Sequence, residues 1–157
     1  MNLVDILKTE LGRDEGVRTE PYDCPAGART TGVGRNLDAN PLTAAEVRVI
    51  GHDGRTKPIS RGNAFWLLDN DINRTMGDLD RALPWWKTLD EVRRRALINM
   101  AYNLGVPRLL GFRKMLAALK AGSYEAAARE AMDSLWSRQV GDRAQRIAHM
   151  LRYGVAP

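Results

Sequence analysis

One segment near the start of the chain limits the possible folds more than any other. Residues 16–34 read GVRTEPYDCPAGARTTGVG and are rich in Gly, Pro and Thr. Glycine and proline disfavour helix interiors and threonine favours strands, so this stretch predicts short strands and turns. The segments on either side have helical spacing instead. We therefore expect an α+β fold in two lobes, rather than an all-helical or all-β one.

The rest of the chain shows the hydrophobic period of amphipathic helices. Apolar side chains recur three or four positions apart in residues 2–12 and 60–80, whereas residues 92–104 are apolar around most of the helix, as in a buried central helix. Two capping boxes, Thr43–Glu46 and Thr88–Glu91, mark helix starts. We expect one domain over residues 1–157, with a β lobe at about 16–36 and a helical lobe at about 41–157 that helix 2–12 joins. Further helices are expected at 108–120, 123–133 and 141–152.

Composition narrows the function without selecting one. The chain has 157 residues, of which 44% are hydrophobic and 27% charged, and this is the balance of a globular domain with a core. Its one cysteine, Cys24, excludes an internal disulfide and a multi-cysteine zinc site. The net charge of +5 predicts a polyanionic partner, which is nucleic acid, an anionic membrane or a cell wall. With no apolar run of 18 residues and a charged start, we expect neither a signal peptide nor a membrane anchor.

Few residues of the chain are candidates for catalysis or for binding a nucleotide. The Gly32-x-Gly34 pair lacks the third glycine of a dinucleotide-binding motif, so nucleotide binding has no support. A cysteine hydrolase needs an imidazole beside its thiol, and His52 and His149 both have the setting of surface residues. Glu15 is the stronger candidate, because a carboxyl group at a helix end beside a glycine turn can act as a general acid. The alternative is that Asp14 and Glu15 form an exposed acidic pair.

Several short motifs carry a family resemblance. The sequence DEGVR at 14–18, then Tyr22 and TTGVG at 30–34, resembles the active-site region of the phage-type lysozymes, the endolysins of glycoside hydrolase family 24. Their pattern is Glu, eight residues, Asp or Cys, five residues, Thr, and Glu15, Cys24 and Thr30 match it without a gap. The resemblance continues nearly to the end of the chain, through LDEVRR at 89–94, INM at 98–100, Trp136 and RAQR at 143–146.

The resemblance implies a role for each matching residue. Glu15 corresponds to the general acid that protonates the glycosidic oxygen, and Thr30 to a residue whose hydroxyl helps to hold the attacking water. Arg143 corresponds to a basic residue that pairs with this glutamate. Arg35 stands where the best-studied members have a histidine paired with an aspartate of the next long helix, which here is Asp71. An Arg35–Asp71 pair would be a structural substitute whose arginine does not titrate near neutrality.

The central helix is expected to contribute substrate contacts. Asn99, Tyr102 and Asn103 align with its cleft-facing edge and are predicted to bind sugar. For Tyr102, a place at the edge of the core is an equally good interpretation.

Cys24 departs from the best-studied pattern, in which an aspartate occupies this place. A thiol does little unless it is ionised, and free cysteine has a pKa of about 8.5. As a thiolate, Cys24 could polarise water, or attack the anomeric carbon and make the reaction retaining. Asp23 is the alternative, but neighbours in a strand point to opposite faces, which favours Cys24.

The function implied is that of an endolysin, which hydrolyses the β-1,4 bond between N-acetylmuramic acid and N-acetylglucosamine in bacterial peptidoglycan. The implied fold is lysozyme-like, with a cleft between the lobes, and we expect a monomer without metal or cofactor. It would stay in the host cytoplasm until a separate pore-forming protein releases it. The basic helix at 143–152 could touch the envelope weakly, although packing on the core is the more common use of such a helix.

Two other classes stay open. One is a non-hydrolytic peptidoglycan-binding protein, which the Cys24 departure favours. The other is a basic helical nucleic-acid-binding protein, which is suggested by charge alone and disfavoured because the chain has no recognisable DNA- or RNA-binding motif.

Overall fold

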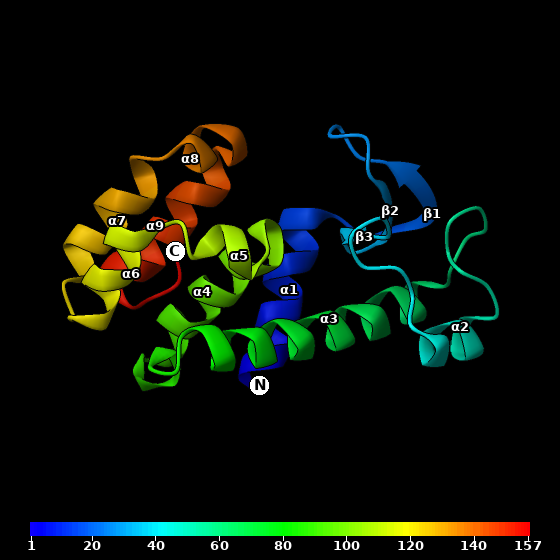
Figure 1. The fold of residues 1–157 in the computed structure, drawn as a ribbon, viewed down its shortest axis with the longest axis horizontal. Helices are drawn as coiled ribbons and strands as arrows, with labels where there is room; N and C mark the ends of the chain where they lie inside the picture. Colours follow the sequence, from blue (N-terminus) through cyan, green and yellow to red (C-terminus); the bar gives the residue numbers. More distant parts are fainter. The chain divides into compact units, whose positions relative to one another are not determined.

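The computed structural model describes all of residues 1–157 and contains two compact units, Met1–Asp71 and Ile72–Pro157 (Figure 1). The first unit holds α1 (Leu3–Glu15), β1 (Arg18–Asp23), β2 (Arg29–Gly32), β3 (Arg35–Asn36), α2 (Ala44–Ile50) and the first half of α3 (Arg61–Ala82). The second holds the end of α3, η1 (Trp86–Thr88), α4 (Glu91–Leu104), α5 (Val106–Leu109), α6 (Arg113–Lys120), α7 (Tyr124–Met132), α8 (Leu135–Val140) and α9 (Asp142–Tyr153). The expected α+β class is confirmed.

Helix α1 runs to Glu15 and passes through Gly12, so it is longer than the predicted 2–12. The side chain of Asn2 begins the helix by accepting a hydrogen bond of 3.0 Å from the backbone N–H of Asp5. Gly16 ends it with a φ of 75°, which residues with a side chain rarely adopt. The break therefore falls directly after Glu15 and places this residue at the helix end.

The three strands form one antiparallel sheet in the order β1-β2-β3. Tyr22 pairs with Thr30 across β1 and β2, and Asp23 pairs with Arg29. The hairpin between them is closed by a hydrogen bond of 2.9 Å from the Cys24 N–H to the Ala28 carbonyl. Cys24 is thus the first residue of a tight turn rather than a member of the strand.

Of the two predicted capping boxes, one is correct. Thr43 and Glu46 exchange both hydrogen bonds at the start of α2. The Thr88–Glu91 box is wrong, because Asp90 caps α4 by accepting from the Arg93 N–H at 3.1 Å. The Thr88 hydroxyl donates instead to the Trp85 carbonyl in the short 3-10 helix η1.

Helix α4 is the buried helix of the second unit, as its apolar sequence predicts. Four of its side chains, those of Ala96, Leu97, Ile98 and Met100, are fully buried. The helix expected at 108–120 is two helices, α5 and α6, which are separated by residues 110–112. No helix combines the length and the apolar character needed to cross a membrane.

Candidate active site

Glu15 lies in close contact with the turn between β2 and β3. A Cβ added to Gly34 would lie 2.9 Å from Glu15 Oε2 and 3.1 Å from its Cδ, and Gly34 has a φ of 67°. Only glycine meets both conditions, so the last residue of the TTGVG motif provides the space for the Glu15 carboxylate. The alternative of an exposed acidic pair is wrong, because the side chain of Asp14 is 1% exposed and Glu15 is half-buried.

The thiol of Cys24 is stabilised as an anion by the hairpin turn. Contact with the backbone at Ala28 is the largest influence and lowers the pKa of the thiol. Burial works against this, but the backbone at Ala26 and Gly27 and the Thr30 hydroxyl lower the pKa further. The turn thereby raises the fraction of thiolate at neutral pH, which is the form that can act on water or on a sugar carbon.

Thr30 connects the thiol to the sheet. Its side chain is buried, and its hydroxyl donates to the Ala28 carbonyl at 2.9 Å. The same hydroxyl also contacts Cys24. A hydroxyl has one proton, so it can donate to the carbonyl or to the sulfur, but not to both. When the thiol ionises, the proton of Thr30 can turn toward the sulfur and stabilise the anion.

Asp23 is engaged in an ion pair with the neighbouring strand. Its carboxylate is exposed and forms an ion pair of 3.2 Å with Arg29, its cross-strand partner. The strand alternation that favoured Cys24 does not apply, because β1 ends at Asp23 and Cys24 belongs to the turn. The choice of Cys24 over Asp23 therefore stays a prediction.

Tyr22 is a residue that the site prediction omitted, although the motif contained it. Its pKa is raised, and burial is the largest cause. The Arg18 guanidinium lies 4.1 Å from the ring centre and lowers the pKa. The charges of Glu15 and Cys24 raise the pKa further. The phenol is therefore within electrostatic range of both predicted catalytic groups and stays protonated as a hydrogen-bond donor.

Arg35 sits at the centre of a buried ion cluster. It donates to Asp71 and to Glu46, each at 2.9 Å, and all three side chains are at most 4% exposed. The carbonyls of Asn40 and Pro41 accept two further hydrogen bonds. The Arg35–Asp71 pair suggested by the resemblance is present, and its effect on the site stays a prediction.

Glu46 was missed as a member of this cluster because the capping box already accounted for it. One of its oxygens accepts from the Thr43 N–H, and the other accepts from Asn70. Burial opposes its ionisation, but the hydrogen bonds from Arg35, Thr43 and Asn70 outweigh burial and lower the pKa of Glu46 to about 2. The carboxylate thus caps α2 and holds Arg35 at the same time.

The second unit contains the other predicted residues. Asn99 is buried on α4 and accepts a hydrogen bond of 2.9 Å from Nε of Arg143. One turn later, Asn103 accepts from the indole N–H of Trp136 at 2.8 Å, while Tyr102 is half-buried. These positions share one face of α4, since they are three and four residues apart. The expected pair of Glu15 with Arg143 joins residues of different units and stays a prediction.

Nowhere in the chain do three or more His, Cys, Asp or Glu side chains gather in a way that could hold a metal ion.

Comparisons with known proteins identify a family for the chain. A family model described as "Phage lysozyme" matches residues 12–150. The chain is 28% identical to "Probable T4-type lysozyme 1" of Dictyostelium discoideum over 97% of its own length and 96% of the relative's. It is also 29% identical to "Pre-baseplate central spike protein Gp5" of Enterobacteria phage T4, of which it spans 28% of the length.

Proposed function

Because the chain belongs to the phage lysozyme family, we propose that it is a muramidase of the endolysin type. It hydrolyses the β-1,4 bond between N-acetylmuramic acid and N-acetylglucosamine in peptidoglycan. The observation that carries this proposal is the placement of Glu15 at a helix end against Gly34, in the same unit as the Cys24–Thr30 turn. Glu15 and Cys24, the first two residues of the family's catalytic pattern, are thus both positioned by the backbone.

In the proposed reaction, Glu15 gives its proton to the glycosidic oxygen as the bond to the anomeric carbon breaks. The Cys24 thiolate and the Thr30 hydroxyl hold a water molecule for attack on the sugar cation. The water forms the new bond to carbon, and its proton passes to the thiolate. Release of that proton to solvent and reprotonation of Glu15 restore the enzyme.

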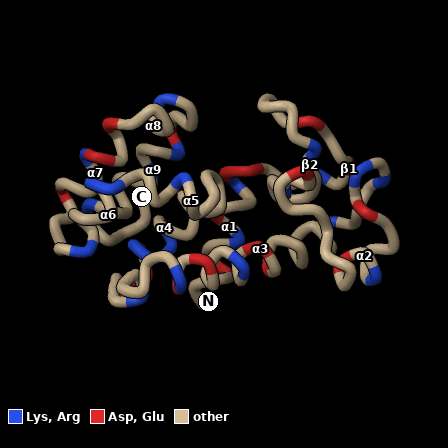
Figure 2. Tube along the Cα trace, viewed as in Figure 1, with Lys and Arg blue, Asp and Glu red and all other residues tan.

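The charge distribution supports a wall substrate over nucleic acid. Figure 2 shows Lys and Arg interspersed with Asp and Glu along both units, and the longest basic run is the three residues Arg93–Arg95 of α4. Nucleic-acid-binding domains usually gather their basic residues on one face. In the cell, the proposed role is lysis of the host after the enzyme reaches the wall through a separate pore.

The decisive experiment compares the wild type with Glu15→Gln on purified peptidoglycan, measured by loss of turbidity and by the new reducing ends. General acid catalysis contributes about 10²–10⁴-fold, so Glu15→Gln should clear the suspension at least about a hundred times more slowly. Glu20→Gln, at an exposed position of β1, is the matched control and should keep wild-type activity.

Mass spectrometry of the products checks the bond, because cleavage at N-acetylmuramic acid leaves that sugar at the reducing end. Clearing by Glu15→Gln at the wild-type rate would contradict the mechanism. Binding without clearing by the wild type would favour the non-hydrolytic alternative.

A further inference from the structure

The proposed reaction leaves a pocket of the first unit unused. It has a volume of about 490 Å³ and lies between one face of α1 and the start of α3. Helix α1 contributes Asp5, Lys8, Thr9 and Arg13 to its lining, and α3 contributes Arg61 and Phe65. Pockets for small ligands commonly measure roughly 300–1,000 Å³, so one sugar with an attached group would fit.

The two helices run in opposite directions along the pocket. Lys8 of α1 pairs with Asp69 of α3 at 3.1 Å, whereas a Cβ added to Gly12 would lie 3.8 Å from the Phe65 ring. Residue numbers thus rise along α1 as they fall along α3. Asp5 precedes Gly12 by seven residues, which is about 10 Å along the helix axis. The pocket therefore has two distinct ends, one at Asp5 and one beside Phe65.

Arg61, at the Phe65 end, is the side chain that points to a ligand. Its guanidinium lies over the Phe65 ring, 5.2 Å from the ring centre. The side chain makes no hydrogen bond or ion pair with another residue. Stacking on an aromatic ring steadies a guanidinium but uses none of its five N–H donors. All of these donors are therefore available to a ligand.

The surroundings of Arg61 favour an anion. Arg61 is the first residue of the 22-residue helix α3, where the helix dipole disfavours a cation, and the first turn of α3 contains no acidic residue. Arg13 adds a second guanidinium to the lining, and only its Nε is engaged, by Asp14 at 3.2 Å. Arginine binds phosphate oxygens in a bidentate manner. A phosphate here would offset charge that the chain leaves uncompensated.

The other end of the pocket suits hydroxyl groups. The carboxylate of Asp5 has no hydrogen-bond or ion-pair partner. The Thr9 hydroxyl donates to the Asp5 carbonyl at 3.3 Å, so its own lone pairs are left to accept. A carboxylate repels a second phosphate but accepts hydrogen bonds from hydroxyls. The two ends together match a ligand that carries a phosphate at one end and hydroxyls at the other.

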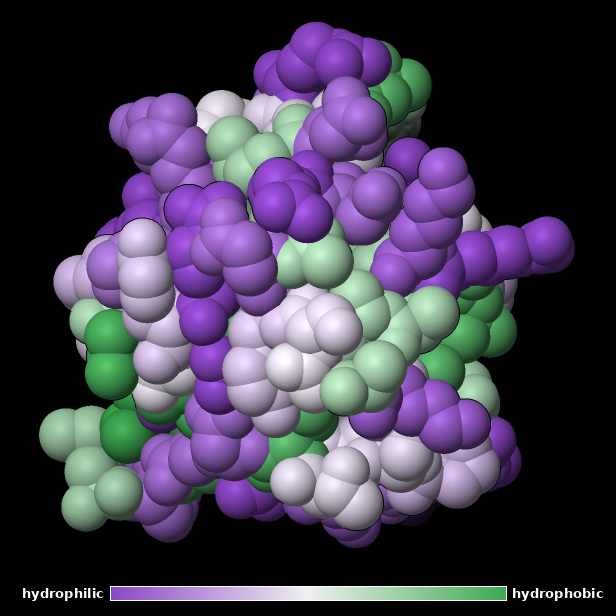
Figure 3. Space-filling view, turned by 90° about the vertical axis from the view of Figure 1, so that its left-hand side faces the viewer, coloured by the Kyte–Doolittle hydropathy of each residue, from purple (hydrophilic) through white to green (hydrophobic).

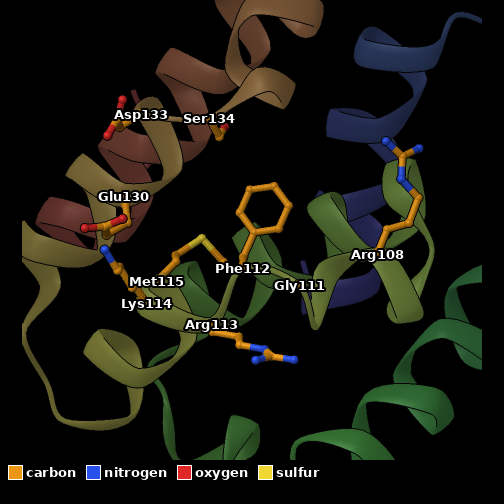
Figure 4. Close-up of a pocket in the computed structure, with 9 residues that line it drawn as sticks. All are labelled: Arg108, Gly111, Phe112, Arg113, Lys114, Met115, Glu130, Asp133 and Ser134. Atoms are coloured by element: carbon orange, nitrogen blue, oxygen red, sulfur yellow. The ribbon is translucent and has the colours of Figure 1, made fainter.

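The pocket at the start of α6 in the second unit lacks a stacked arginine. Figure 4 shows Arg108 and Arg113 standing apart from the Phe112 ring, which packs against Trp136 instead. The face of the second unit in Figure 3 is mostly hydrophilic, with small hydrophobic areas between charged side chains. The α1–α3 pocket is therefore the one in which an aromatic ring positions a free cation.

We propose that the α1–α3 pocket binds a phosphorylated sugar. The phosphate contacts Arg13 and Arg61, the sugar ring lies beside Phe65, and the hydroxyls donate to Thr9 and Asp5. Through these contacts the enzyme is retained on the phosphate-bearing glycans of the bacterial envelope while it cleaves peptidoglycan. The retention rests on the proposed function, whereas the binding of a sugar phosphate does not.

A titration tests the pocket without requiring turnover. Glucose 6-phosphate, glucose and inorganic phosphate are titrated separately into the full chain, with affinity measured by calorimetry and the site mapped by NMR on backbone amides. The wild type should bind glucose 6-phosphate at least about tenfold more tightly than glucose or phosphate, and Arg61→Gln should lose about this factor. Arg48→Gln is the matched control, because Arg48 is an exposed, unpaired arginine of α2 outside the pocket, and it should bind like the wild type.

The same titration can overturn the proposal in three ways. An equal loss in Arg48→Gln would mean attraction to net charge. Inorganic phosphate that binds as tightly as glucose 6-phosphate would remove the role of the sugar. Amide shifts that leave residues 5–13 and 61–65 unmoved would place the ligand elsewhere. Asp5→Asn sharpens the assignment, because it should weaken glucose 6-phosphate and not inorganic phosphate.

A second assay measures retention on the wall. Co-sedimentation compares walls that keep their phosphate-bearing glycans with walls from which hydrofluoric acid has removed them, and Glu15→Gln is the parent chain so that the wall is not digested. The parent should bind the phosphate-bearing wall about tenfold more tightly. Adding Arg61→Gln should abolish this difference, and adding Arg48→Gln should retain it.

The outcomes separate this inference from the proposed function. Equal binding to both walls, or equally tight Arg61-dependent binding to phosphatidylglycerol vesicles, overturns retention by a glycan. If the wild type clears neither wall, the proposed function fails, and the sugar-phosphate site is still decided by the titration.

Discussion

The two units hold their candidate site residues in different ways. In the first unit the backbone sets the positions: Glu15 ends a helix against Gly34, and Cys24 begins a hairpin turn. In the second unit side-chain amides do so, because Asn99 holds Arg143 and Asn103 holds Trp136. A backbone-defined site fails when the main chain cannot adopt its conformation, whereas a side-chain contact can be removed one hydrogen bond at a time. The first unit should therefore be the more sensitive to substitution.

The largest effect is expected at Cys24. Cys24→Ser removes the group that can ionise, so peptidoglycan cleavage should fall by about 10²-fold or more. Asp23→Asn should stay within about twofold of the wild type, since its carboxylate faces Arg29. Full activity in Cys24→Ser together with loss in Asp23→Asn would reverse the assignment.

The pH dependence of the same variants sharpens this test. The pKa of the Cys24 thiol is lowered, and the thiolate is the form above that pKa. Wild-type activity should therefore rise with pH as the thiol ionises. Cys24→Asp should extend activity to lower pH, because a carboxyl group ionises near pH 4. A rate profile from pH 4 to 9 on the same peptidoglycan measures the rise in the wild type and its displacement to lower pH in Cys24→Asp.

Gly34→Ala tests whether the backbone truly sets the position of Glu15. The added Cβ displaces the carboxylate that lies 2.9 Å away, and misplacement of about 1 Å can cost about 10²-fold in rate. Gly122→Ala is the matched control, since it has a similar φ of 78° and no atom within 4 Å of its Cβ. Both variants should lose about 1 kcal/mol of stability from the positive φ. Only Gly34→Ala should lose the activity. Equal losses of activity in the two variants would mean that backbone strain, and not displacement of Glu15, is the cause.

The buried cluster of the first unit should make stability depend on acid pH. The folded pKa of Glu46 is about 2, below its ordinary value of 4.5. Its contribution is therefore complete above about pH 4.5 and is lost as the pH falls toward 2. Glu46→Gln should lower the free energy of unfolding by roughly 3 kcal/mol at pH 7 and flatten this part of the curve. Urea unfolding at pH 7 and pH 3 measures both, with exposed Glu20→Gln as the control. An unchanged pH dependence in Glu46→Gln would contradict this account.

The smallest effect is expected in the second unit. Trp136→Phe removes the hydrogen bond to Asn103 but keeps an aromatic ring beside Phe112. The loss should be about 1 kcal/mol in thermal or urea unfolding. Trp66→Phe, in the first unit, lacks such a bond and should change stability less. A loss of stability several times larger in Trp136→Phe would mean that the side-chain contacts of the second unit are as sensitive to substitution as the backbone-defined positions of the first.

The sequence predicted local features wherever neighbouring residues control them. The Gly, Pro and Thr content of residues 16–34 predicted the sheet, and the Thr43–Glu46 spacing predicted a cap that the structure contains. The Thr88–Glu91 box has the same spacing and failed, because the preceding residues form a 3-10 turn that uses the Thr88 hydroxyl. A local pattern is reliable only where no tertiary arrangement competes for its groups.

The buried ion cluster is a feature that no local sequence pattern predicted. Arg35 was connected with Asp71 only by resemblance, and Glu46 had already been explained as a cap. Their meeting depends on how α2 and α3 pack beside β3, which no short window of sequence contains. The chemistry of Cys24 has the same origin: the sequence identified the residue, but the lowered pKa comes from the hairpin turn that folds around it.

By itself, the sequence determined the α+β class, the family and the identity of the predicted catalytic residues, because these depend on local propensity and on the order of residues. Tertiary structure alone decided that Gly34 leaves room for Glu15, that Thr30 reaches the thiol and that Glu46 joins Arg35. The physical reason is that hydrogen bonds, ion pairs and steric contacts act over a few ångströms in space. The residues that make them can be tens of positions apart in the chain.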